Sequence, residues 1–163
     1  SFQWDTAMLH KLLYFFLLSS SIVIAQETKP LDKELLLEMI NAQSTQGCQC
    51  GDKYYPEVSA LVWSDKLASV AQAHSNEMAQ RNQLTHYSKN GSDPGKRLSK
   101  AGYHWQAYAE NVAMGYSDEK TVVQGWISSP GHCANIMNPN VKEMGVARKG
   151  KYWTQVFGSE NYK

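Results

Sequence analysis

The stretch GWISSPGHCANIMNP, residues 125–139, combines a helix start with a histidine beside a cysteine. Serine is a favoured N-cap and proline fits the first helical position, so Ser129 and Pro130 predict a helix that runs to about Met137. His132 then lies in the first turn, where the helix dipole disfavours positive charge. Its imidazole is expected to be neutral at pH 7, with a lone pair available for a metal or a hydrogen bond. A local hydrogen bond that closes the helix start explains His132 equally well.

The beginning of the chain differs in character from the rest. An apolar run of about 13 residues, Leu12 to Ile24, follows His10 and Lys11 and ends at a small residue, Ala25. This pattern is typical of a secretory signal peptide, and the run is shorter than the roughly 20 residues that span a bilayer. We predict an N-terminal extension and signal peptide at 1–25 and a single domain at 26–163. The protein is expected to be secreted, to the cell exterior or to the periplasm of a Gram-negative host, without a stable membrane anchor.

Charge and composition restrict the partners. The formal net charge is +1, and no cluster of Lys or Arg forms a basic stripe. Nucleic acid and anionic membrane surfaces are therefore poor candidates. The chain contains nine Tyr and five Trp, which suit a compact domain with an aromatic groove.

The three cysteines predict one disulfide bond. They are Cys48, Cys50 and Cys133. In an exported protein the default is a bridge with one leftover thiol. A bridge between Cys48 and Cys50 would be strained, so one of these two is expected to reach Cys133. Half of a zinc site is the alternative interpretation of the CxC pair, although no nearby histidine or second cysteine pair completes four ligands.

Apolar periodicity and turn residues predict helices on both sides of a small antiparallel sheet. Residues 46–58 are rich in turn formers and predict a loop, as does the polar stretch 86–95. The predicted elements are helices at 31–44, 64–82 and 97–101, a helix that begins at 117–119, a helix at 129–137, a strand at 108–115 and a β-hairpin within 143–159 that turns at 149–150.

Three further residues are candidates for chemistry. Glu110 lies in an otherwise apolar strand, where a carboxylate costs several kcal/mol unless it is paired or ligated. The alternative for Glu110 is an outward-facing position. His86 ends the segment after the second helix and is either cleft-lining or an ordinary loop histidine. His74 lies on the apolar face of that helix and is expected to be a hydrogen-bonded core histidine.

Common enzyme signatures are missing. The sequence has no HExxH, no GxSxG and no glycine-rich phosphate loop. Cys133 lacks the flanking motif of a papain-like nucleophile, and a disulfide would consume its thiol.

Five ordered segments resemble a known family. The chain resembles the CAP superfamily, also called SCP/TAPS or PR-1-like, and most closely its bacterial secreted branch. The resemblance implies a three-layer α-β-α sandwich of the α+β class, in which helices flank a three-stranded antiparallel sheet. The matching segments are LVWSDKLASVAQAHSNEMAQRNQLTH (61–86), AGYHWQAYAENVAMGY (101–116), VVQGWISSPGHCANIMNP (122–139), EMGVA (143–147) and YWTQVFG (152–158).

The resemblance also implies a cavity lined by two histidines and two acids, which in some members holds zinc. His86 matches the first histidine and Glu110 the first acid. Ser129 stands where the second acid is usual, and Tyr152 where the second histidine is usual, so the set is broken at two positions. We infer a re-formed site of His86, Glu110 and His132, bordered by Ser129 and Tyr152. Two imidazoles and a carboxylate suit a divalent metal such as zinc, or a metal-free hydrogen-bonded cluster.

The family pattern implies that Cys50 pairs with Cys133 and that Cys48 is the odd thiol. It also implies three candidate functions. The favoured one is a secreted, non-enzymatic binding module for a lipid, a sterol, another small ligand or an extracellular protein partner. The alternatives are a metal-assisted, peptidase-like hydrolase that uses His86, Glu110 and His132, and a structural interaction protein of the cell envelope.

Overall fold

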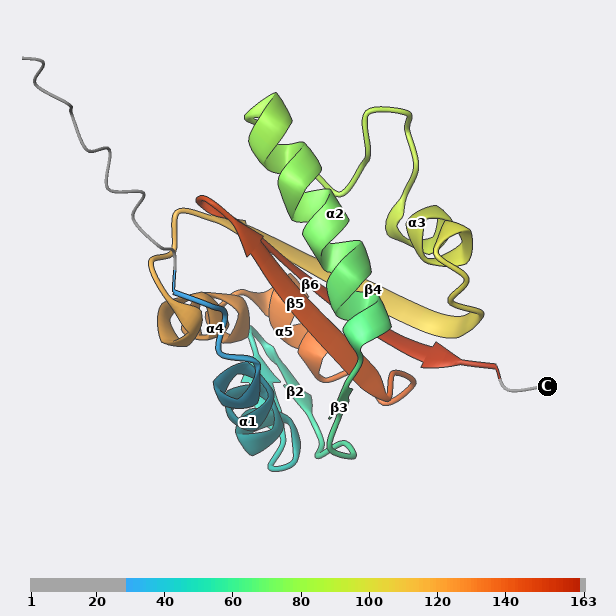
Figure 1. Cartoon of the computed structure of the whole chain (residues 1–163). Coiled ribbons are helices and arrows are strands. Elements are labelled where there is room, and N and C mark those ends of the chain that lie inside the picture. The colour runs from blue at the N-terminus through green and yellow to red at the C-terminus, as the bar shows by residue number, and fades with distance from the viewer. Residues whose placement is uncertain (1–28, 162–163) are drawn as a thin grey trace, which may run out of the picture.

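The computed structural model describes residues 29–161, and its centre is a four-stranded sheet (Figure 1). The signal peptide predicted at 1–25 lies outside the described residues. Three strands pair antiparallel, and a two-residue strand at one edge pairs parallel. In spatial order the strands are β3 (Val62–Trp63), β5 (Glu143–Lys149), β6 (Tyr152–Glu160) and β4 (Trp105–Met114). The predicted three-stranded antiparallel sheet is thus present, with β3 added to it.

Helices cover both faces of the sheet. The long helix α2 crosses one face over β5 and β6, with α3 beside it near β4. Within residues 29–161, α1, α4 and α5 pack on the opposite face. The helices are α1 (Lys33–Ser44), α2 (Asp65–Arg81), α3 (Pro94–Lys100), α4 (Glu119–Ser128) and α5 (Pro130–Ile136). The structure therefore has the predicted α-β-α architecture. In the described part of the chain no helix is both long and apolar enough to traverse a bilayer.

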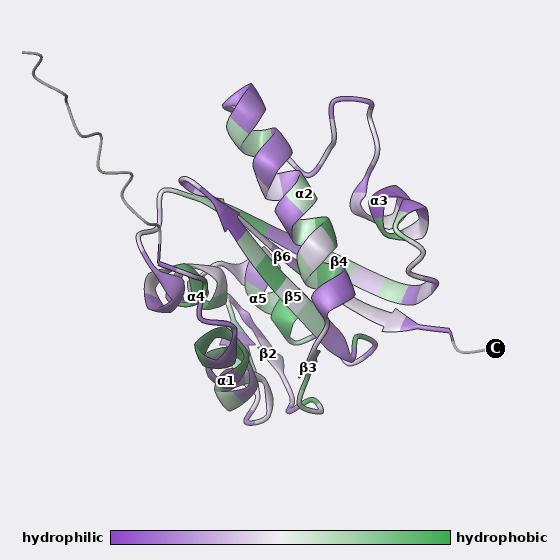
Figure 2. Ribbon diagram, viewed as in Figure 1, coloured by the Kyte–Doolittle hydropathy of each residue, from purple (hydrophilic) through white to green (hydrophobic). Residues whose placement is uncertain are grey.

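The side chains of β6 alternate between the two faces of the sheet and contribute to two separate hydrophobic cores. Trp153 and Phe157 point to the side of α1, α4 and α5 and belong to the larger cluster. Val156 points to the other side and packs with Leu67 and Ala71 of α2. Because side chains alternate between the two faces of a strand, one apolar segment stabilises both layers. Figure 2 shows the resulting apolar band along β5 where α2 crosses it.

Local capping fixes the ends of α2 where the sequence predicts them. The Ser64 hydroxyl accepts a hydrogen bond from the Leu67 amide at 3.2 Å. At the other end, Asn82 adopts φ of 53°, a left-handed conformation that asparagine tolerates and that ends the helix. The segment 83–86, which ends at His86, follows directly after this second cap.

The segment 46–58 is not a plain loop, and this prediction was wrong. It contains a hairpin of β1 (Cys48–Cys50) and β2 (Lys53–Tyr55). Each strand has only three residues, which is too short for an alternating apolar pattern to be read from the sequence. The hairpin packs against α5, so tertiary contact stabilises it.

Gly145 of β5 controls how closely α2 approaches the sheet. A Cβ atom at this position would collide with the α2 main chain, 2.6 Å from the carbonyl carbon of Leu67. Gly145→Ala is expected to lower the free energy of unfolding by about 2–3 kcal/mol, because rigid main chain must move. Gly131→Ala in α5 is the control: its Cβ meets nothing within 4 Å, and alanine favours a helix by up to about 1 kcal/mol. Urea unfolding of both variants checks the expectation, and equal effects would contradict it.

Candidate functional site

Glu110 supplies the buried charge around which the site is built. It lies within β4, where it pairs with Val156 of β6, and it is 6% exposed. The interpretation of Glu110 as an outward-facing strand residue is therefore wrong, and the interpretation as a paired acid holds. A buried carboxylate without partners would cost several kcal/mol.

Arg97 and His86 both bind the Glu110 carboxylate. Nη2 of Arg97 lies 2.5 Å from Oε2, and Nδ1 of His86 lies 2.9 Å from Oε1. The other terminal nitrogen of Arg97, Nη1, donates to the main-chain oxygens of His86 and Ser92 at 2.8 and 3.1 Å. Arg97 therefore compensates the charge of Glu110 and at the same time fastens the segment 86–92 to α3.

His74 of α2 lies beneath this cluster. It is buried, as expected for a core histidine, and its Nε2 lies 2.7 Å from the Thr85 carbonyl oxygen and 3.9 Å from Oε1 of Glu110. No hydrogen bond to another residue within 29–161 reaches its Nδ1. Burial lowers the pKa of His74, although Glu110 opposes that effect. The ring is therefore neutral at pH 7, and it packs next to the Glu110 carboxylate in the interior of the protein.

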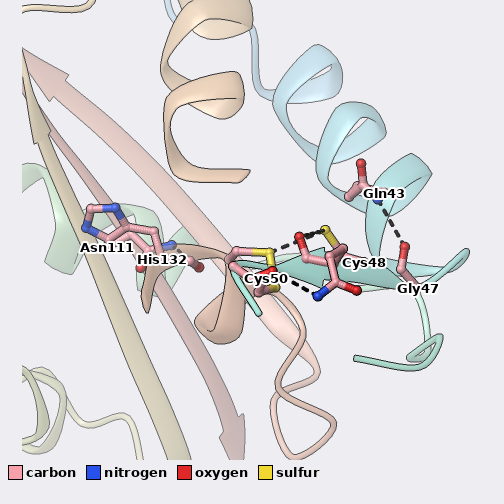
Figure 3. Close-up of a disulfide and its surroundings, with 9 residues drawn as sticks. Gln43, Gly47, Cys48, Cys50, Asn111 and His132 are labelled. Carbon is pink, nitrogen blue, oxygen red and sulfur yellow. Dashed lines mark hydrogen bonds between the residues drawn. A yellow bond between two sulfur atoms is a disulfide. The ribbon is translucent and has the colours of Figure 1, made fainter. Parts of the chain in front are cut away.

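His132 of α5 approaches the site from the other layer. Its imidazole is half-buried and points away from the nearby disulfide (Figure 3). Its main-chain oxygen accepts a hydrogen bond from the Asn111 amide at 3.2 Å, which holds α5 against β4. Burial lowers the pKa of His132, and the nearby imidazole of His86 lowers it further. The two histidines are thus close enough to influence one another electrostatically.

Ser129 and Tyr152 are the two residues predicted to border the cleft. Ser129 is the N-cap position of α5, but its side chain makes no capping hydrogen bond. Tyr152 shares the α2 face of β6 with Thr154 and is buried beside Met78. Its hydroxyl donates to Oδ1 of Asn82 at 3.2 Å. Among the described residues, no hydrogen bond links either side chain to Glu110, so their place as cleft borders stays a prediction.

The cluster is a poor fit for a divalent metal. Both carboxylate oxygens of Glu110 already accept hydrogen bonds, and the Arg97 guanidinium brings a positive charge to the point where a cation would bind. The atoms of His86, Glu110 and His132 do not gather within 4.8 Å of one another. In the part of the chain that the structure describes, three cysteines form the one group of potential ligands that does so. The predicted zinc site is therefore not favoured by this arrangement.

The lowered pKa values of His74 and His132 predict a decline of stability in mild acid. In the unfolded chain a histidine binds a proton near pH 6.5. In the folded protein His74 and His132 bind a proton only at lower pH, because burial lowers their pKa. As pH falls below about 6.5, the free energy of unfolding should drop by up to about 1.4 kcal/mol per pH unit for each. His74→Gln should flatten this decline in urea unfolding measured from pH 7.5 to 5, whereas His104→Gln, at an exposed position, should not. Equal slopes would contradict the assignment.

A cavity of about 540 Å³ adjoins the cluster at Arg97, which forms part of its lining. It lies between α2, the segment 88–92 and α3. Glu77 also borders it, but its carboxylate is occupied by the Lys89 amide and by Arg81. The apolar part of the lining comes from Val70, Ala73 and Ala101, and the basic part from Lys89, Arg97 and Lys100.

Sequence reasoning missed Arg97 and treated His74 as ordinary core. The signal that could have pointed to an arginine was Glu110 itself, because a buried carboxylate requires a cation nearby. The chain contains three arginines, Arg81, Arg97 and Arg148. Nothing in the spacing selects Arg97 among these three, because the contact depends on how the segment 86–93 folds back.

A disulfide bond joins β1 to α5. It links Cys50 and Cys133, the pair that the family resemblance implies, across a separation of 83 positions. Cys48 is the remaining thiol and is buried. The bridge therefore attaches α5, the helix that carries His132, to β1.

Comparison with known proteins places these features in a family. A model of the family described as "Cysteine-rich secretory protein family" (CAP) matches residues 57–158. Two curated relatives from Bacillus subtilis are each 34% identical: "Uncharacterized membrane protein YlbC" over 100 residues, 61% of this chain, and "Uncharacterized protein YkwD" over 95 residues, 57% of this chain. The aligned part spans only 29% and 37% of their lengths.

Solved structures agree on the fold. An extracellular protein with an SCP domain from Bacillus anthracis is 33% identical, with a TM-score of 0.61, over 63% of this chain and 35% of that one. An outer surface protein from Borrelia burgdorferi has a TM-score of 0.67 over 78% of this chain and 92% of that one, at 20% identity, which supports the fold alone. With helices and sheet arranged as in these domains, and the family model covering most of the folded part, the chain belongs to the cysteine-rich secretory protein (CAP) family.

Proposed function

We propose that the chain is a non-enzymatic binding module of an exported protein, and that it takes a small ligand with an apolar body and an anionic group. The observation that carries the proposal is the cavity of about 540 Å³ beside Arg97, which combines an apolar wall with basic side chains. Ligand sites are commonly concave and mostly apolar, with a few polar groups that fix orientation. A lipid-like molecule with a carboxylate or phosphate group has this chemistry.

The occupied state of Glu110 supports binding over catalysis. A general base needs an oxygen free to accept a proton from a substrate or a water molecule. Arg97 and His86 each hold one oxygen of Glu110. The hydrolase alternative therefore requires this pairing to break first, and the cluster is better suited to keep the cavity wall rigid. The Bacillus anthracis relative, which is described as an extracellular protein, supports an exported location.

Fluorescence titration with cis-parinaric acid, a fluorescent fatty acid, tests the proposal. Saturable binding is expected for the parent protein. Ala73→Trp should abolish it, because the new side chain fills the cavity, whereas Gln80→Trp, on the same helix outside the cavity, should not. Lys100→Glu is expected to weaken binding about tenfold, since reversing one charge near an anion costs about 1.4 kcal/mol.

Lys120→Glu on α4 makes the same change of charge away from the cavity and serves as the control. Absence of saturable binding in the parent protein would refute the proposal. Equal losses in Lys100→Glu and Lys120→Glu would place the ligand elsewhere.

A further inference from the structure

A group of three buried sulfur atoms lies outside the candidate site. The Sγ atoms of Cys48, Cys50 and Cys133 all lie within 4.8 Å of one another. Each of the three residues is at most 6% exposed. The Cys48 thiol is 3.3 Å from Sγ of Cys133, which is already bonded to Cys50.

The strand geometry explains why two cysteines reach the same partner. Side chains two positions apart on a strand point to the same face. In β1 the burial alternates accordingly: Cys48 and Cys50 are buried against α5, and Gln49 between them is exposed. A third sulfur in contact with a bridge is therefore a consequence of the CxC spacing in this strand.

We infer that these three sulfurs form a disulfide-exchange centre, in which Cys48 and Cys50 alternate as the partner of Cys133. The Cys48 thiolate attacks Sγ of Cys133, a bond forms between these two atoms, and the bond from Cys133 to Cys50 breaks. Cys50 leaves as a thiolate and takes up the proton that Cys48 released. One thiol and one disulfide exist before and after the step, so no oxidant or reductant is consumed.

The centre keeps α5 attached to β1 in either form. A strained Cys48–Cys50 bridge is not required at any point, because Cys133 takes part in both pairings. Burial raises the pKa of the Cys48 thiol, so the reactive thiolate is scarce at neutral pH. Exchange should therefore be slow near pH 7 and accelerate by about tenfold per pH unit while Cys48 remains mostly protonated.

Cysteine variants of the full chain test the inference after aerobic refolding. Cys50→Ser is expected to form a Cys48–Cys133 bridge and to show no free thiol with Ellman's reagent in denaturant, as Cys48→Ser also should. Cys133→Ser should show two free thiols. Two free thiols in folded Cys50→Ser would overturn the inference, since Cys48 would then be unable to take over the bridge.

The parent protein gives a second test that does not depend on how a variant folds. Samples held at pH 8.5 are quenched with acid, alkylated in denaturant and digested without reduction, and tandem mass spectrometry locates the label within the peptide that contains residues 48–50. Label on both Cys48 and Cys50, approached at a rate independent of protein concentration, is the expected result. Label confined to Cys48 at every time over several hours would overturn the inference.

Discussion

Glu110→Ala is expected to lower the free energy of unfolding by about 3–5 kcal/mol. The substitution leaves the guanidinium of Arg97 in a mostly buried position without its carboxylate, and removing one member of a buried ion pair is costly because the other charge stays uncompensated. The reverse change, Arg97→Ala, is expected to cost a similar amount, because Glu110 is the more deeply buried partner. Urea unfolding monitored by tryptophan fluorescence measures both.

Two controls separate the ion pair from a general effect of substitution. Glu57→Ala removes a carboxylate from an exposed loop position and should change the free energy of unfolding by less than about 0.5 kcal/mol. The double variant Glu110→Ala with Arg97→Ala should be less destabilised than the sum of the single variants, because neither charge is then left alone. Strict additivity would mean that the two groups do not interact in solution.

Cys133→Ser is expected to destabilise the domain by about 4 kcal/mol. The bridge closes a loop across a separation of 83 positions, and the chain-entropy relation for a loop of this length gives a stabilisation of that order. Because Cys133 is common to both pairings of the exchange centre, its removal eliminates the bridge altogether. The measurement is urea unfolding under non-reducing conditions, compared with the parent protein before and after reduction.

Cys48→Ser is the matched control, since it changes a buried cysteine of the same cluster and leaves the Cys50–Cys133 bridge in place. Its free energy of unfolding should fall by no more than about 1 kcal/mol. If Cys133→Ser and Cys48→Ser are destabilised equally, the bridge contributes nothing beyond the packing of a small side chain.

Local signals in the sequence were sufficient for much of the fold. The ends of α2 follow from Ser64 and Asn82, whose effects act within one helical turn. The turn before β6 follows from Gly150, which adopts φ of 56° between two apolar strands. The β1–β2 hairpin could not be read in the same way, because its strand residues gain their order from contact with α5 rather than from an apolar pattern.

The candidate site could be predicted only in part, because some of its contacts also depend on tertiary structure. Glu110 could be identified because an acidic residue within an otherwise apolar strand is visible in the neighbouring sequence alone. Its principal partner, Arg97, lies 13 positions earlier on a short helix, and the contact exists because the segment 86–93 folds back onto β4. The spacing of the cysteines likewise could not choose between Cys48 and Cys50, because both side chains point to the same face of β1.

The position of β4 at the margin of the sheet has a consequence for self-association. A ten-residue outermost strand is a template on which a foreign chain could extend the sheet. Here the side-chain amide of Asn135 donates to the main-chain oxygen of Glu110 at 3.2 Å, and to Oδ1 of Asn111 at 2.8 Å. A second molecule could pair with this carbonyl only by displacing the Asn135 side chain, so the helix that carries His132 also protects one point of the open edge.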